Sequence, residues 1–130
     1  MAGGNEIRRD FPGRGVLDIW DTNSWKLIRE IEANEYEIRP ILHLPKEDLV
    51  LSVDLHPPKV GHLTSYKTVI NGYSIKTGER LLSYDTQLAA SDYCTAAIYL
   101  EGLNAICIGD HHGKISFFSV AEILKQKKQP

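Results

Sequence analysis

The stretch GVLDIWD, Gly15–Asp21, has two similar copies later in the chain, TVINGYS at Thr68–Ser74 and GKISFFS at Gly113–Ser119. Each copy has apolar or small residues at its third and fifth positions and an aromatic residue at its sixth. The third and fifth positions are Leu17 and Ile19 in the first copy, Ile70 and Gly72 in the second, and Ile115 and Phe117 in the third. The sixth positions, in the same order, are Trp20, Tyr73 and Phe118. The copies start at residues 15, 68 and 113, close to the spacing of roughly 40–45 residues that is typical of repeated four-stranded units. The pattern predicts a repetitive all-β fold.

The whole chain, with the three copies included, is predicted to contain nine strands. Each is a short run of alternating or branched apolar residues, and turn-forming residues separate one run from the next. The strands are Val16–Asp21, Leu27–Ile31, Ile38–Leu44, Asp48–Asp54, Thr68–Ser74, Glu79–Tyr84, Thr95–Leu100, Leu103–Gly109 and Lys114–Val120. Pro45 ends a strand because proline cannot donate to a ladder, and Gly78 can adopt the positive φ of a tight turn. Only Val120–Lys127 is predicted to be helical.

A second alignment within the chain indicates an insertion. Leu49–His56 (LVLSVDLH) matches Ala105–His112 (AICIGDHH) at an offset of 56 residues, whereas the seven-residue copies that follow are offset by 45. The 11-residue difference is the segment Pro57–Lys67, which replaces a tight turn in the later copy. Long loops on a rigid frame often carry binding residues.

Composition excludes several classes of protein. The 130 residues include 15 basic and 17 acidic side chains, and a net charge of −2 provides no global field that would attract nucleic acid or an anionic membrane. Neither a signal-peptide run nor 18 consecutive apolar residues occur in the sequence. We therefore expect a cytoplasmic protein, with the nucleus as the alternative, in which Cys94 and Cys107 are small core residues rather than a disulfide.

GVLDIWD followed by a turn and a branched strand resembles the closing part of a WD repeat, in which glycine leads the third strand of a blade and Trp-Asp ends it. Asp110 resembles the turn aspartate of that family, and Asp54 occupies the matching place. Ser74–Thr86 also resembles the Thr-Gly turn of quinoprotein-type propellers. The resemblance implies antiparallel four-stranded β-propeller blades over residues 15–120, with 15–33, 34–86 and 87–120 as successive blades. Residues 1–14 would be a flexible lead-in, and residues 121–130 a basic tail.

Nine strands cannot close a propeller, which needs about four to eight blades of four strands. They amount to about two and three-quarter blades of a degenerate WD-repeat-type ring. We therefore expect an incomplete ring that corresponds to the C-terminal portion of a larger propeller, either as a natural shortened product or as a fragment. Its open blade faces and edges would be routes to association.

Several residues invite a chemical interpretation that we weigh against a structural one. His43, His56, His62, His111 and His112 could join Asp54 or Asp110 in a metal site, but neighbouring side chains in a tight turn diverge, so we favour turn capping by the aspartates. The sequence contains no nucleophile elbow or paired catalytic motif, so we expect no catalytic residues and no enzyme activity. We also expect neither a metal nor a cofactor. We expect Trp20, Tyr73 and Phe118 to pack between blades rather than to stack on bases.

Two loops remain as candidates for partner binding. In a WD-type blade, the loops Glu32–Glu37 and Pro57–Lys67 would share one face of the ring. The candidate residues are Glu32, Glu35, Tyr36, Glu37, Lys59, His62, Tyr66 and Lys67. An acidic loop beside a basic, aromatic loop suits a protein or peptide partner, so we expect a non-enzymatic interaction scaffold. The alternatives are a propeller enzyme of quinoprotein or hydrolase type, a regulatory or non-functional truncated product, and loops that are merely solvated.

Overall fold

A computed structural model of the chain describes residues 4–6, 14–34, 41–44, 46–56, 67–89 and 94–127. Within these ranges the strands are β1 (Gly4–Glu6), β2 (Arg14–Trp20), β3 (Leu27–Asn34), β4 (Ile41–Leu44), β5 (Leu49–His56), β6 (Lys67–Ser74), β7 (Arg80–Ala89), β8 (Cys94–Leu100), β9 (Ala105–Asp110) and β10 (Ile115–Ser119). A 3-10 helix, η1 (Glu101–Leu103), joins β8 to β9, and a short helix, α1 (Val120–Leu124), follows β10. Across these ranges, no helix has the length and apolar character needed to cross a membrane.

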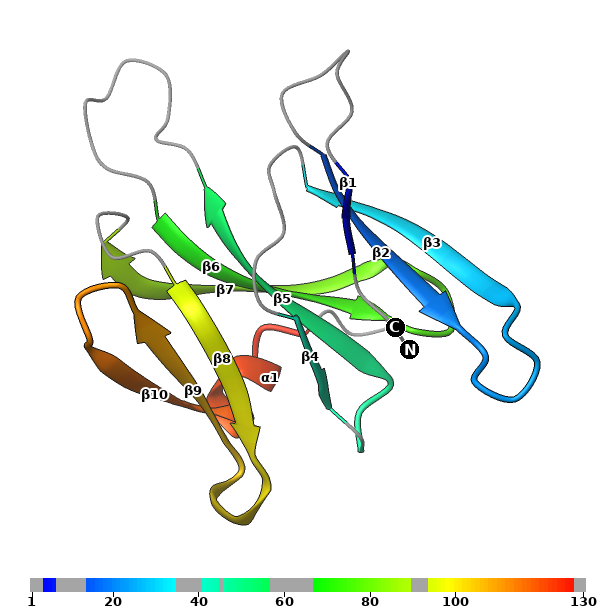
Figure 1. The fold of residues 1–130 in the computed structure, drawn as a ribbon. Helices are drawn as coiled ribbons and strands as arrows, with labels where there is room; N and C mark the ends of the chain where they lie inside the picture. Colours follow the sequence, from blue (N-terminus) through cyan, green and yellow to red (C-terminus); the bar gives the residue numbers. More distant parts are fainter. Residues whose placement is uncertain are drawn as a thin grey trace.

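The strands form three antiparallel sheets, each made of strands that follow one another in sequence. We call β1-β2-β3 the N-terminal sheet, β4-β5-β6-β7 the central sheet and β10-β9-β8 the C-terminal sheet. Figure 1 shows the central sheet between the other two. The predicted all-β class and antiparallel pairing are confirmed.

The apolar core lies in two layers, one on each side of the central sheet. The first layer joins the N-terminal and central sheets through Leu17, Ile19, Ile31, Val50 and Tyr73. The second layer joins the central sheet to the C-terminal sheet and α1 through Leu42, Leu44, Leu49, Leu51, Val53, Ile70, Leu82, Ile106, Ile108, Val120 and Ile123. Both faces of the central sheet are therefore covered by other parts of the same chain.

The repeat positions face the same way at both layers. Leu17 and Ile19, the third and fifth positions of the first copy, pack in one cluster with Tyr73, the sixth position of the second. Likewise Ile70, the third position of the second copy, packs in one cluster with Phe118, the sixth position of the third. At both layers, therefore, the third position of one copy faces the following sheet, and the sixth position of the next copy faces the preceding sheet.

The hairpin turns extend this equivalence beyond seven residues. In the β2–β3 turn, the Trp25 amide donates to the Asp21 carbonyl at 2.7 Å, and in the β6–β7 turn the Gly78 amide donates to the Ser74 carbonyl at 2.8 Å. Trp25 has a φ of 56° and Gly78 a φ of 77°, so both residues lie in the left-handed region that favours glycine. The two hairpins are therefore structural repeats from the strand through the turn.

Arg29 on β3 fastens the N-terminal sheet to the β6–β7 turn. Its Nε donates to the Ile75 carbonyl at 3.3 Å, its Nη1 donates to the Thr77 carbonyl at 3.2 Å, and its Nη2 donates to the Lys76 carbonyl. A cationic donor makes these hydrogen bonds stronger than neutral ones. The two sheets are thus joined by polar as well as apolar contacts.

The structure differs from the sequence predictions at several positions. β7 continues to Ala89, beyond the predicted end at Tyr84, and Leu103 lies in η1 rather than at the start of a strand. Gly4–Glu6 forms β1 and pairs with β2, although no strand is predicted before Gly15. Asp54 lies inside β5, which continues to His56, and not in a turn. Cys107 is a free thiol, half-buried on the outward face of β9 instead of in the core, because its neighbours Ile106 and Ile108 take the inward positions.

Candidate interaction surfaces

The predicted partner-binding residues fall mostly outside the described part of the chain. Glu35, Tyr36, Glu37, Lys59, His62 and Tyr66 all lie outside it. Glu32 is exposed on β3, and Lys67 is exposed at the start of β6, where its Nζ lies 3.3 Å from Asp85 Oδ2 on β7. An exposed ion pair of this kind contributes about 0–1 kcal/mol. The structure therefore places two of the eight residues, on different sheets, and the shared loop face stays a prediction.

A buried polar cluster that the sequence analysis missed lies between β5 and β6. Asp54 Oδ2 accepts a hydrogen bond from Ser52 Oγ at 2.9 Å and another from Asn71 Nδ2 at 2.6 Å. All three residues are exposed by 1% or less. Ser52 and Asn71 are directly opposite each other in the ladder, so the carboxylate braces the two strands. The sequence feature that could have revealed this cluster is the placement of polar residues between apolar ones on both β5 and β6, which pair with each other.

Tyr73 extends this cluster toward the N-terminal sheet. Burial raises the pKa of its hydroxyl above the usual range, and the negative charge of Asp54 raises it further, while Arg80 and a hydrogen bond with Ser52 act in the opposite direction. Tyr73 therefore remains a neutral hydroxyl at physiological pH. Since Ser52, Asp54, Asn71 and Tyr73 are all buried, the cluster belongs to the interior of the fold.

Asp110 has the turn geometry that the sequence predicts. Its Oδ1 accepts hydrogen bonds from the backbone amides of His112 and Lys114, both at 2.9 Å. Slight desolvation alone would raise the pKa of this carboxyl, but the two amide donors and the adjacent histidines outweigh it, so the pKa lies below its ordinary value. The carboxylate therefore caps the β9–β10 turn in its charged form.

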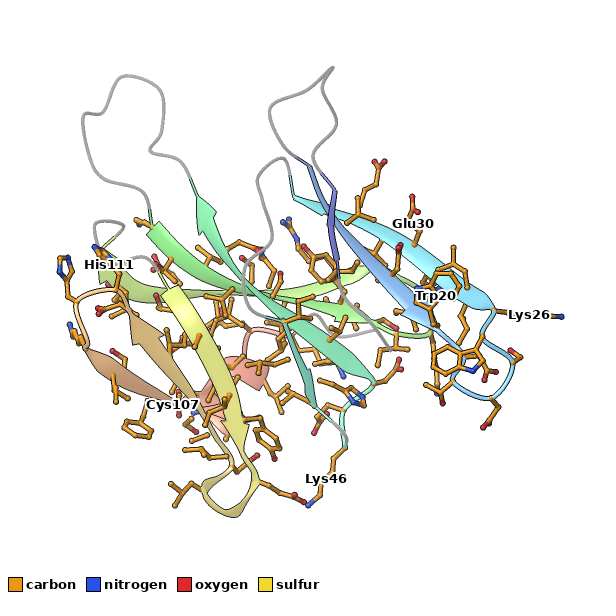
Figure 2. All side chains as sticks on the ribbon, in the orientation of Figure 1. Trp20, Lys26, Glu30, Lys46, Cys107 and His111 are labelled. Atoms are coloured by element: carbon orange, nitrogen blue, oxygen red, sulfur yellow. The ribbon has the colours of Figure 1, made fainter. Side chains whose placement is uncertain are left out.

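The histidines do not assemble a metal site in the described residues, where no group of three or more His, Cys, Asp or Glu side chains could hold an ion. The rings of His111 and His112 lie 3.9 Å apart between centroids in the β9–β10 turn. Figure 2 shows His111 at the outer end of this turn, directed away from the sheets. His43 is exposed on β4 of another sheet, and the side chains of His56 and His62 lie outside the described ones.

The three repeat aromatics differ in burial. Tyr73 is 2% exposed in the first core layer. Phe118 is partly buried in the second, where its ring meets Tyr84 edge-on with centroids 6.1 Å apart. Trp20 is 37% exposed, on the side of the N-terminal sheet that faces away from the central sheet (Figure 2). Tyr73 and Phe118 thus pack between sheets, whereas Trp20 lies on an outer face.

A pocket of about 260 Å³ lies between the central and C-terminal sheets, at the end of β5 opposite to His56 and Lys67. It is lined by Leu44, Lys46, Glu47, Tyr99, Glu101, Asn104, Val120 and Leu124. Leu44 and Val120 are buried, whereas Lys46 and Glu101 are exposed. The pocket therefore has an apolar floor and a charged rim. Figure 2 shows Lys46, one of the rim residues, at the β4–β5 turn.

Hydrogen bonds hold one wall of this pocket in place. The Tyr99 hydroxyl donates to the side-chain carbonyl of Asn104 at 3.0 Å. The Asn104 backbone carbonyl accepts from the Val120 amide at 3.0 Å, which fixes the start of α1. Since the wall is formed by hydrogen-bonded elements rather than a single loop, the pocket is largely preformed.

A scan against protein-family models matched none of them, and a search of the curated proteins found no match.

Proposed function

We propose that this chain is a non-enzymatic protein-interaction module built from propeller-type blades, and that it binds a peptide segment of a partner protein at the pocket between the central and C-terminal sheets. The observation that carries this proposal is the combination of an apolar floor at Leu44 and Val120 with the exposed charges of Lys46 and Glu101. An apolar centre with a polar rim is the usual composition of a protein interface.

The stacking of the sheets supports the propeller assignment. Equivalent repeat positions pack at both core layers, and the β2–β3 and β6–β7 turns share their hydrogen bonds. Sheets of consecutive antiparallel strands that stack face to face in sequence order are what a propeller requires. On this proposal the three sheets are successive blades of a WD-repeat-like ring.

The size of the pocket favours a peptide over a free small molecule. Small-molecule sites usually enclose about 300–1,000 Å³, and this pocket is smaller, at about 260 Å³. One apolar side chain of a peptide would occupy the floor, while flanking charged residues of the peptide would lie near Lys46 and Glu101. These rim charges would chiefly select among partners and accelerate association.

The experiment compares two charge-exchange variants of the full chain that keep its net charge. Lys46→Glu/Glu101→Lys inverts the rim, and the matched control Lys26→Glu/Glu79→Lys inverts two exposed charges in the β2–β3 and β6–β7 turns. Peptides selected from a random displayed library on the unmodified chain are labelled and titrated by fluorescence anisotropy. We expect the rim variant to weaken binding about tenfold, which is about 1.4 kcal/mol, and the control to leave it unchanged.

Two results would contradict the proposal. One is a library selection that yields no peptide with saturable binding to the folded chain. The other is binding that responds equally to the rim variant and to the control, because the peptide would then be recognised elsewhere.

A further inference from the structure

The outward face of the C-terminal sheet is uncharged and strongly apolar. The strand registers place nine residues on it: Ala96, Ile98, Leu100, Ala105, Cys107, Gly109, Ile115, Phe117 and Ser119. Its three large exposed side chains are Ile98, Ile115 and Phe117, with exposed fractions of 53%, 62% and 60%. Phe117, Cys107 and Ile98 form one continuous row across the three strands. Contiguous apolar faces of this kind mark sites of association.

The repeat identifies the kind of surface that this face fits. Ile115 and Phe117 are the third and fifth positions of the last copy. In the first copy both positions, and in the second copy the third position, pack in one cluster with the sixth-position aromatic of the following copy. The expected occupant is therefore a sheet that presents an aromatic side chain at the sixth position of the repeat.

This chain presents such a surface at its opposite end. Trp20, the sixth position of the first copy, is paired in register with Leu27, and the two side chains are 37% and 46% exposed on the outward face of the N-terminal sheet. Asp18 on the same face occupies the repeat position of Asn71, and Asn71 is already buried at an internal sheet interface. Val16 on the same face is 3% exposed and therefore already covered, so the face is open at the end that carries Trp20 and Leu27. At that end Trp20 occupies the repeat position of Tyr73, which packs with Leu17 and Ile19 within the chain.

We propose that two copies of this chain associate head to tail, with the outward face of β8–β10 of one copy packed on the outward face of β1–β3 of the other. The contact repeats the packing between the N-terminal and central sheets: Ile115 takes the place of Leu17, Phe117 that of Ile19, and Trp20 that of Tyr73. Because the two faces differ, the interface is heterologous, and each copy keeps one further face for another contact. The pocket of the proposed function lies between two sheets of the same copy, so the two proposals can fail separately.

Association of the full chain is measured by sedimentation equilibrium from micromolar to submillimolar concentration. We expect the mass to rise from the 14.6 kDa of one chain to at least twice that value. Phe117→Asp and Trp20→Asp should each weaken self-association at least about tenfold, as the loss of a central aromatic anchor does at other interfaces. Leu103→Asp is the matched control, since Leu103 is 72% exposed but lies in η1, off both faces. It should associate like the unmodified chain.

Mixing the two variants distinguishes this arrangement from a symmetric one. Phe117→Asp retains an intact N-terminal face and Trp20→Asp an intact C-terminal face. An equimolar mixture should therefore form a one-to-one pair at concentrations where each variant alone is monomeric. In a symmetric dimer through the C-terminal faces, Trp20→Asp alone would still dimerise and the mixture would form no new pair. Far-UV circular dichroism verifies that each variant is folded, and the milder Phe117→Ser and Trp20→Ser replace any variant that is not.

The proposal is overturned if the unmodified chain remains a monomer over the whole concentration range. It is equally overturned if Trp20→Asp associates as well as the unmodified chain, if the mixture stays monomeric, or if Leu103→Asp abolishes association.

Discussion

Adding one methyl group at Gly72 tests how tightly the central sheet is packed. Gly72 lies on β6 between Leu51 on β5 and Leu82 on β7, and both leucines lean into the space that a side chain would fill. A Cβ atom at this position would lie 2.8 Å from Leu82 Cγ and 3.0 Å from Leu51 Cδ2. Both distances are shorter than van der Waals contact, so at least one leucine would have to leave its position in the second core layer.

The size of the effect follows from two opposing contributions. Overpacking a well-filled core costs about 1–3 kcal/mol. Replacing glycine also restricts the unfolded chain, which returns about 0.5–1 kcal/mol. We therefore expect Gly72→Ala to lower the free energy of unfolding by about 1–2 kcal/mol, which corresponds to a melting temperature about 4–8 °C lower for a chain of this length.

Thermal unfolding followed by far-UV circular dichroism provides the assay. Gly102→Ala is the control, because a Cβ atom on Gly102 would meet no atom within 4 Å and its φ is not positive. It should leave the melting temperature unchanged or raise it slightly. If Gly72→Ala is as stable as Gly102→Ala, then Leu51 and Leu82 do not pack over Gly72 and our description of the central sheet is wrong.

Three further changes probe the turns and the buried cluster. Trp25→Gly should raise the melting temperature by about 2–4 °C, because relief of a left-handed conformation that costs a non-glycine residue about 1–2 kcal/mol exceeds the about 0.5–1 kcal/mol that glycine adds in unfolded-state freedom. A lower melting temperature would show that the indole is packed. Asn71→Leu should cost about 1.5–3 kcal/mol in urea unfolding, since the carboxylate of Asp54 loses its 2.6 Å donor; a change below about 0.5 kcal/mol would exclude this brace. Asp110→Asn should be less stable than the unmodified chain near neutral pH, and the difference should shrink as the pH falls through the lowered pKa of Asp110, because a depressed folded-state pKa stabilises only above that range. A difference that does not vary with pH, measured by urea midpoints, would contradict this linkage.

The strands whose apolar residues alternate were predictable, and the short strand β1 was not. Thr68–Ser74 and Lys114–Val120 match β6 and β10 to within one residue at each end, because each strand contributes apolar side chains to the core. Gly4–Glu6 has no apolar pattern, and it forms a strand because it pairs with the backbone of β2. Backbone hydrogen bonding of this kind leaves no trace in the side-chain sequence.

The pocket could not be predicted from the sequence, because its lining residues are far apart along the chain and only the packing of the sheets brings them together. The pocket combines Lys46 from the central sheet with Glu101 and Leu124 from the C-terminal part of the chain, and no motif links these residues in sequence. Asp54 resembled Asp110 by alignment, but β5 extends to His56, so that the same residue type is buried in one repeat and caps a turn in the other. The burial of Trp20 likewise depends on which sheet lies next to it.

The consecutive order of the strands also bears on how the chain folds. Every ladder joins strands that are neighbours in sequence, so loop closure costs little entropy and hairpins can nucleate locally. During synthesis, β2 and β3 emerge from the ribosome before β5 and β6, so Leu17 and Ile19 are covered only once β5 and β6 have been made. The N-terminal hairpin must therefore wait with its apolar face uncovered. Once complete, the central sheet is the part whose amide hydrogens should exchange most slowly, since both of its faces are buried.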